Sequence, residues 1–222
     1  MRRACALLVL VLLAGCGSAA GEGDGTAQLW VTRDRGETLL LDVEVAAGQT
    51  VMRALAAEAE IETRYGGRFL QSVDGLAGDA AAQRDWFWFL NGYEGDRSAA
   101  EVRLREGDVA WFDYREWREP GEARVVVGAF PEPFLHGYAG RTRDAVVVYA
   151  PGAEVRAREL GEVVGAVAVE PVGFAVPAGA NVLEVRSGEP LATISLLGET
   201  AGDPVHVVLS GDVDPTRAFE VR

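Results

Sequence analysis

The apolar beginning of the sequence is the feature that most constrains this chain. Two arginines follow Met1, residues 4–13 are all apolar, and the run closes shortly before Cys16. A run this short cannot cross roughly 30 Å of hydrocarbon, because a membrane-spanning helix needs about 20 residues. A basic start followed by a short apolar run is typical of a signal peptide whose arginines stay on the cytoplasmic side. We therefore expect residues 1–15 to be a signal peptide.

The segment LAGC at residues 13–16 resembles the bacterial lipobox. Small residues before Cys16 give a peptidase access to the backbone, and the thiol can be alkylated by a diacylglyceryl group. The alternative is an ordinary signal peptide with an incidental cysteine. Two or more acyl chains anchor stably, since each buried CH₂ contributes about 0.8 kcal/mol. We predict that Cys16 becomes a lipidated N-terminus, which anchors the protein to the extracytoplasmic face of the cell membrane.

Composition restricts the partners of the mature chain. Cys5 and Cys16 are the two cysteines of the sequence, so cleavage and lipidation leave no thiol for a disulfide. The full sequence has a formal net charge of -13, and loss of Arg2 and Arg3 makes the mature chain more acidic still, so it is not expected to bind nucleic acid through its bulk surface. Residues 16–27 are mostly glycine and alanine with a few polar residues and no large apolar side chain, and they cannot bury enough surface to fold. They are expected to form a flexible tether.

Residues 28–117 show the pattern of a small mixed domain. Two strand-like runs flank the turn signal RDRG at residues 33–36, which predicts a hairpin. Thr50 is a candidate N-cap for a helix that starts at Val51. Several strand-like runs follow: residues 61–65, 69–73, 86–90 and 109–114. The fold class expected here is α+β, with one helix on one face of a mixed sheet, the β-grasp pattern.

The pattern breaks at residues 117–122, and a second domain is expected over residues 122–222. Residues 151–160 favour a short helix after a buried-type strand at residues 146–149. Further strand-like runs alternate with turns rich in glycine and proline: residues 163–169, 181–185, 192–197 and 205–209. This half is interpreted as a strand-rich α+β domain.

Four segments of the first domain resemble the transcobalamin-like C-terminal domain family. They are VAAGQTVMRAL at residues 45–55, SVDGL at 72–76, WFWFLNG at 86–92 and LREGDVAW at 104–111. The resemblance covers roughly residues 28–115 and implies a small β-grasp domain. In bacteria, domains of this family are often part of surface lipoproteins. In vertebrate relatives this domain closes over one face of cobalamin, so the resemblance implies a corrinoid-like ligand class.

Aromatic residues alternate along two of the expected strands. Trp86 and Trp88 share one face of the first strand, whereas Phe87 and Phe89 share the other. Because a β-grasp sheet has a single helix, we expect the face opposite the helix to be covered by the C-terminal half or local loops, by a ligand, or by a partner protein. The side chains predicted to contact a ligand are Trp86, Trp88, Asn91, Tyr93, Trp111 and Tyr114.

The sequence lacks the motifs of common enzymes. It contains two histidines, His136 and His206, and neither a Gly-x-Ser-x-Gly elbow nor a glycine-rich phosphate loop. His206 is interpreted as a polar position in an apolar strand and His136 as a loop histidine packed on aromatics. Asp203 with His206, or Asp212 with Asp214, is too sparse a donor set for a metal site. No cofactor and no catalytic activity are therefore expected.

These features predict non-catalytic binding of a small, partly apolar ligand for a membrane importer. The competing hypothesis is a surface adhesion or scaffolding lipoprotein whose aromatic face meets another protein. An uncharacterised hydrolase is the third alternative.

Overall fold

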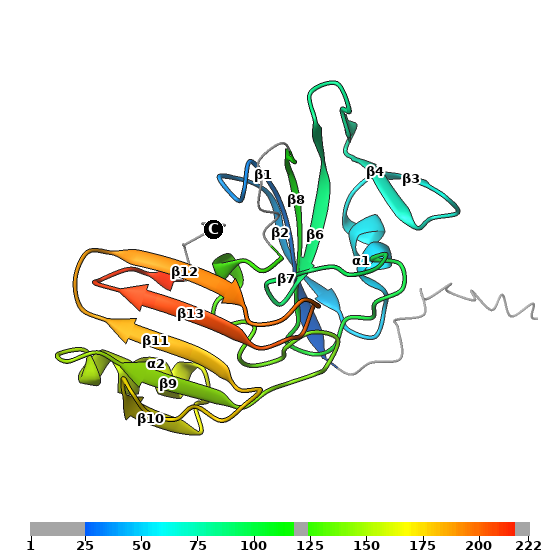
Figure 1. Cartoon of the computed structure of the whole chain (residues 1–222). Helices are drawn as coiled ribbons and strands as arrows, with labels where there is room; N and C mark the ends of the chain where they lie inside the picture. The colour runs from blue at the N-terminus through cyan, green and yellow to red at the C-terminus, as the bar shows by residue number, and fades with distance from the viewer. Residues whose placement is uncertain (1–24, 118–123, 216–222) are drawn as a thin grey trace, which may run out of the picture.

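The computed structural model describes residues 25–117 and 124–215 (Figure 1). Two five-stranded sheets and one three-stranded sheet, with two α-helices, make an α+β protein that is mostly sheet. The predicted lipidation site at Cys16 lies outside the described residues. Within the described part, neither helix has the length and apolar character needed to cross a membrane.

The first sheet brings the beginning and the end of the N-terminal half together. Its strand order is β2-β1-β8-β6-β7, with β1 antiparallel to β2 and parallel to β8, and β6 antiparallel to β8. β1 starts two residues before the expected start of the folded domain, because Ala27 already packs in the core. The strands are β1 (Thr26–Arg33), β2 (Thr38–Ala46), β6 (Arg84–Leu90), β7 (Tyr93–Glu94) and β8 (Val109–Glu116).

Helix α1 (Val51–Glu58) crosses one face of this sheet. The Thr50 hydroxyl accepts a hydrogen bond from the Arg53 amide at 3.3 Å, which confirms the predicted N-cap. Val51, Met52, Ala54 and Leu55 are buried against the sheet. The helix has eight residues and is about 12 Å long. It is therefore too short to cover the whole face.

The chain between α1 and β6 forms a small antiparallel sheet beside the helix (Figure 1). Its strands are β3 (Ile61–Arg64), β4 (Phe69–Val73) and β5 (Leu76–Ala77). Leu70 and Val73 join the main core, whereas Phe69 is 41% exposed. The small sheet thus extends the helical layer and leaves its own outer face open.

The second large sheet, of order β10-β9-β11-β13-β12, is parallel except for β12. Helix α2 (Glu154–Val163) links two parallel strands and continues to Val163, where a strand was expected. Gly161 allows the end of α2 to pack closely against Val169, because a Cβ at residue 161 would lie 2.8 Å from the Val169 side chain. The strands are β9 (Ala145–Tyr149), β10 (Ala168–Pro171), β11 (Asn181–Arg186), β12 (Leu191–Leu196) and β13 (Val205–Ser210).

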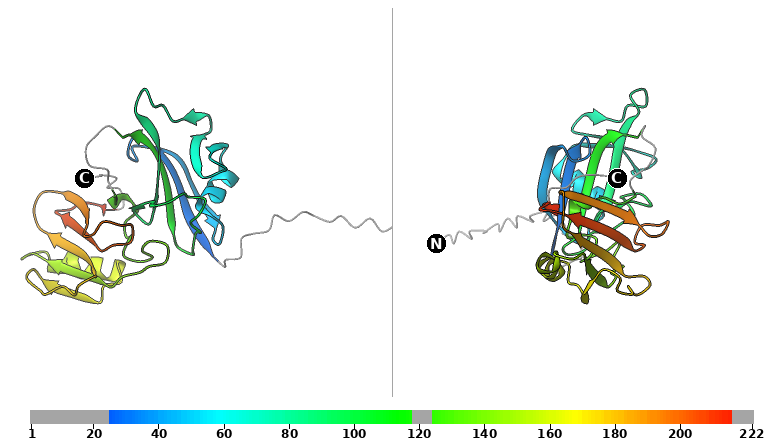
Figure 2. Two further views of the ribbon diagram at one scale, coloured as in Figure 1. Left: turned by 45° about the vertical axis from the view of Figure 1, so that its right-hand side comes forward. Right: turned by 60° about the vertical axis from the view of Figure 1, so that its left-hand side comes forward.

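Residues 125–144, including the 3-10 helix η1 (Val127–Ala129), join the two large sheets (Figure 2). The Val126 amide donates to the Gly92 carbonyl at 2.7 Å, and the Glu94 amide donates to the Arg124 carbonyl at 2.9 Å. Buried side chains of both halves form one continuous cluster. The expected domain boundary near residue 120 lies outside the described residues, but the interior on its two sides is shared.

Candidate functional site

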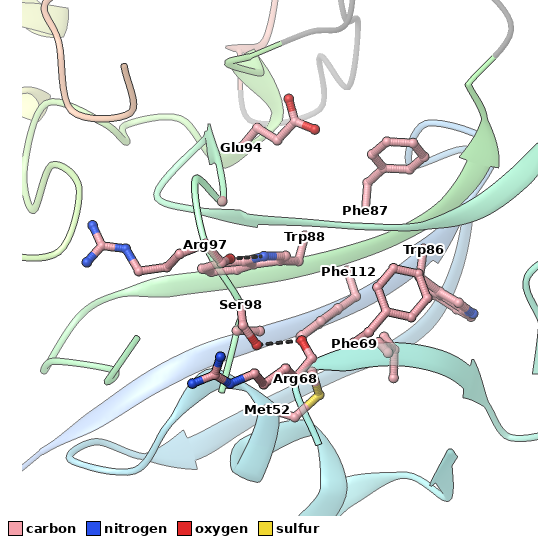
Figure 3. A pocket seen from close by; sticks show the side chains of 13 residues that line it. Met52, Arg68, Phe69, Trp86, Phe87, Trp88, Glu94, Arg97, Ser98 and Phe112 are labelled. Atoms are coloured by element: carbon pink, nitrogen blue, oxygen red, sulfur yellow. Dashed lines mark hydrogen bonds between the residues drawn. The ribbon is translucent and has the colours of Figure 1, made fainter. Parts of the chain in front are cut away.

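A hollow of about 310 Å³ opens on the helix-bearing face of the first sheet, at the end that α1 leaves uncovered (Figure 3). Its floor is aromatic and is formed by Trp86 and Trp88 of β6 and by Phe112 of β8, whereas Phe87 borders it from the other side of β6. Its walls come from α1, from the start of β4 and from the loop after β7. The lining residues are Met52, Arg68, Phe69, Leu70, Trp86, Phe87, Trp88, Glu94, Gly95, Arg97, Ser98, Ala99 and Phe112.

Trp88 is the half-buried centre of this hollow. Its Nε1 donates a hydrogen bond to the Arg97 carbonyl at 3.1 Å. The indole lies against the backbone of Gly95, because a Cβ at that position would be 1.9 Å from Trp88 Cε2. The ring is therefore fixed by one hydrogen bond and one close contact.

Trp86 forms the deeper part of the floor. It is 8% exposed, and its Nε1 donates to the Leu76 carbonyl at 2.9 Å. Tyr114 packs behind it with ring centroids 5.3 Å apart, and the Tyr114 hydroxyl donates to the Ala77 carbonyl at 3.1 Å. Tyr114 thus supports the floor from below rather than lining the hollow.

The rim of the hollow is polar. Arg68 lies 3.4 Å from Glu101, and Arg97 donates to Asp96 at 2.8 Å. The hydrogen bond from Arg97 lowers the pKa of the Asp96 carboxyl. The Ser98 hydroxyl donates to the Arg68 carbonyl and joins the two arginine-bearing segments across the opening (Figure 3). An aromatic floor with a charged rim suits a partly apolar molecule that carries a few polar groups.

Asn91, predicted to contact a ligand, lies in the interior instead. It is 0% exposed and uses its whole amide, since Nδ2 donates to Asp108 and to the Gly137 carbonyl, both at 2.7 Å. Oδ1 accepts from the Val109 amide at 2.7 Å. Its φ of 50° is in the left-handed region that asparagine tolerates. These contacts fix the turn after β6 to the joining segment.

Tyr93 and Trp111 also lie away from the hollow. The buried Tyr93 hydroxyl donates to the Asp203 carbonyl at 2.9 Å, and burial raises its pKa. Trp111 Nε1 donates to Thr32 Oγ1 at 2.6 Å on the opposite face of the sheet. Of the six predicted contacts, the hollow brings together only Trp86 and Trp88.

The face opposite the helix is packed around its centre. Phe89 and Trp111 are 0% and 1% exposed, with ring centroids 5.1 Å apart, and Val126 of the joining segment completes their cluster. The Arg115 guanidinium lies 4.9 Å from the Phe89 ring centroid, close enough for a cation–π contact. The C-terminal half thus supplies a cover, and the open hollow lies on the helix-bearing face.

Sequence reasoning missed the walls and rim of the hollow. Met52 was predicted only as part of the helix that starts at Val51, and Phe69 only as part of the strand-like run at residues 69–73. Arg68, Arg97 and Ser98 lie in turns with no recognisable motif. They meet Trp88 because the small sheet and the loop after β7 fold over the same end of the main sheet.

The two histidines each pair with a glutamate. His136 contacts the buried Glu132 through Nδ1, and its backbone amide donates to Glu132 Oε2 at 3.0 Å. Burial raises the pKa of Glu132. His206 Nε2 lies 3.0 Å from Glu184 Oε2 on the second sheet. Among residues 25–117 and 124–215, no three metal-ligating side chains gather into a cluster.

One comparison with known proteins covers the region that carries the hollow. A family model described as a domain of unknown function, DUF4430, matches residues 48–116. No curated protein matches the chain. A crystal structure of a candidate metal-binding protein from Ruminococcus gnavus is similar at 20% identity and a TM-score of 0.36, over 42% of this chain and 98% of that one.

Haptocorrin in complex with Cbi is similar at 16% identity and a TM-score of 0.36. The likeness covers 42% of this chain and 25% of haptocorrin. Both structural matches are thus confined to less than half of this chain.

Proposed function

We propose that this protein is a membrane-anchored lipoprotein that binds a small, partly apolar ligand without catalysis in the hollow around Trp88, for delivery to a membrane importer. The observation that carries the proposal is the fixed, half-exposed Trp88 indole on an aromatic floor beside two arginines. A buried tryptophan would serve the core alone. This one keeps part of its ring toward an open cavity, where an apolar molecule can gain contact area.

The size of the cavity restricts the ligand. A volume of about 310 Å³ is at the lower end of the range found for sites that enclose drug-sized molecules. A corrinoid-like ligand, which the family resemblance implies, is larger than this cavity, so the hollow would contact only one edge of it. A smaller molecule with an anionic group would fill the hollow and reach Arg68 or Arg97.

We also infer that residues 28–117 form a β-grasp domain. The inference is supported by the initial hairpin, by one helix on one face, and by the parallel pairing of β1 with β8 in the middle of the sheet. In such an arrangement the helix leaves part of its face free, and a hollow can form there.

Native mass spectrometry of the full chain purified from its own membranes tests ligand binding without assuming an identity. We expect an added small-molecule mass in the wild-type protein and its loss in Trp88→Ala. Titration with cobinamide then tests the corrinoid class, with an expected loss of affinity of about tenfold or more in Trp88→Ala. Equal retention of the bound mass by both proteins would place the site elsewhere.

The anchor has its own test. Cys16→Ser should release the protein from the membrane fraction or leave its precursor uncleaved, and should abolish incorporation of labelled fatty acid. Unchanged, detergent-dependent retention of the variant would contradict anchoring through Cys16.

A further inference from the structure

A second hollow, of about 320 Å³, lies beside the first, and Phe69 lines both. It is bounded by the outer face of the small sheet, by the loop after β5, and by the start of β6. Its lining residues are Arg64, Tyr65, Phe69, Gln71, Gly78, Ala80, Arg84, Asp85 and Trp117. None of them was predicted to contact a ligand.

Exposed aromatic rings concentrate at this second hollow. In the described part of the chain, four aromatic side chains stand out as exposed: Tyr65 at 79%, Phe69 at 41%, Trp117 at 45% and Phe174 at 42%. Three of the four line the second hollow. Tyr65 and Phe69 meet edge to face with ring centroids 6.2 Å apart. The hollow therefore offers apolar ring surface to solvent from more than one side.

The Tyr65 side chain contributes little to the stability of the fold. Its φ is 52°, and it is the only aromatic with positive φ among residues 25–117 and 124–215. The left-handed region is sterically costly for a bulky residue, and glycine or asparagine would occupy this turn at lower cost. The backbone of Tyr65 is therefore strained, and its side chain, which is 79% exposed, offsets little of that cost by burial. Backbone strain at a bulky, exposed residue occurs more often at functional sites, so the Tyr65 ring is a candidate ligand contact.

The polar groups of the hollow include both donors and acceptors. Arg64 Nε donates to Gln71 Oε1 at 2.6 Å, which places a guanidinium and an amide side by side. Asp85 Oδ1 accepts from the Trp86 amide at 2.8 Å. Gly78 leaves room for this carboxylate, because a Cβ there would be 2.6 Å from Asp85 Oδ1. A ligand in this hollow would meet flat rings and a mixed set of hydrogen-bonding groups.

We propose that the hollow around Tyr65, Phe69 and Trp117 is a second binding site and that its ligand is a neutral saccharide. A pyranose has one face of C–H groups, which packs on an aromatic ring, and hydroxyls at its edge that both donate and accept, as serine hydroxyls do. The exposed rings match the first property, and Arg64, Gln71 and Asp85 match the second. These groups keep hydrogen-bonding capacity beyond the contacts that they make with each other and with the backbone, and a saccharide can use it whereas a purely apolar ligand cannot.

Calorimetric titration of the full chain with cellotetraose, maltotetraose and chitotetraose tests this proposal, in a detergent without a sugar headgroup. We expect at least one of them to bind. Trp117→Ala and Tyr65→Asn should each weaken that binding by about tenfold or more. Phe174→Ala is the matched control, since it removes an equally exposed ring outside the hollow. Trp88→Ala should leave saccharide binding unchanged, which separates this site from the first hollow.

Tyr65→Asn also distinguishes a binding role from a structural one. Asparagine tolerates positive φ, so the melting temperature should stay the same or rise while saccharide affinity falls. The proposal is overturned if none of the three saccharides binds at about 10 mM, or if Phe174→Ala weakens binding as much as Trp117→Ala. Binding of a proline-rich peptide that depends on Trp117, without saccharide binding, would instead make this a peptide groove.

Discussion

The indole of Trp88 occupies the space that a side chain on residue 95 would need. A Cβ built on Gly95 would lie 1.9 Å from Trp88 Cε2 and 2.1 Å from Cζ2. The loop after β7 can therefore close over the ring only because residue 95 is glycine. The orientation of Trp88, at the centre of the first hollow, thus depends on the absence of a side chain at Gly95.

Gly95→Ala should displace the Trp88 ring. The added methyl group overpacks a close contact, and such changes typically cost about 1–3 kcal/mol. We expect an altered near-ultraviolet circular dichroism spectrum and weaker ligand retention in native mass spectrometry. Gly75→Ala is a suitable control, since a Cβ there meets nothing within 4 Å and only its positive φ adds strain. A spectrum identical to that of the wild type would show that the loop moves instead of the ring.

Trp88→Ala and Phe89→Ala should differ in kind, although the residues are neighbours. Phe89 is 0% exposed between Trp111 and Arg115, so its truncation should cost about 3–5 kcal/mol of unfolding free energy. Trp88 is half-buried, so its truncation should cost less stability and more binding. Urea denaturation of both variants measures the difference. Equal, severe destabilisation would mean that Trp88 is a core residue.

Shortening the chain tests how far the two halves depend on each other. A fragment of residues 25–117 retains the complete first sheet and α1, and should unfold cooperatively. It should be less stable than the full chain, because it lacks the Val126 cover over Phe89 and the Tyr138 ring that lies 5.9 Å from Tyr93. A fragment of residues 25–144 should recover part of the loss. Equal urea midpoints for the two fragments would contradict a stabilising role of the joining segment.

Glu132 should make stability depend on pH. Burial raises the pKa of its carboxyl above the ordinary value of 4.5, so the folded state binds this proton more tightly than the unfolded chain does. The tighter proton binding contributes fully to the free energy of unfolding below pH 4.5. This contribution is lost as pH rises through the higher pKa of Glu132 in the folded state.

Glu132→Gln removes the ionisation and retains an acceptor for the His136 amide. Between pH 4.5 and about pH 7.5 the wild type should therefore lose stability relative to the variant. Urea denaturation of both proteins at the two pH values measures the difference. If the difference in unfolding free energy between the wild type and Glu132→Gln is the same at both pH values, protonation of Glu132 is not linked to folding.

The local elements of this protein are determined largely by its sequence. Thr50 and the apolar spacing after it specify α1, and alternation places Trp86 and Trp88 on one face of β6 and Phe89 on the other. Both patterns depend on residues close together in the chain, whose periodicity is fixed by backbone geometry. The extent of α2 was harder to predict, because Val163 suits a strand as well as a helix and only packing against the sheet decides between them.

Only tertiary packing decided which aromatic side chains of the first sheet remain exposed. Trp86, Trp88, Trp111 and Tyr114 are equally aromatic in the sequence. Val126 and Arg115 cover Trp111 and Phe89 on one face, whereas the short α1 leaves Trp88 half-exposed on the other. Phe69, Arg68 and Arg97 come to the same hollow from segments distant in the chain. Exposure depends on which distant segments lie over a side chain, and local sequence patterns do not encode that information.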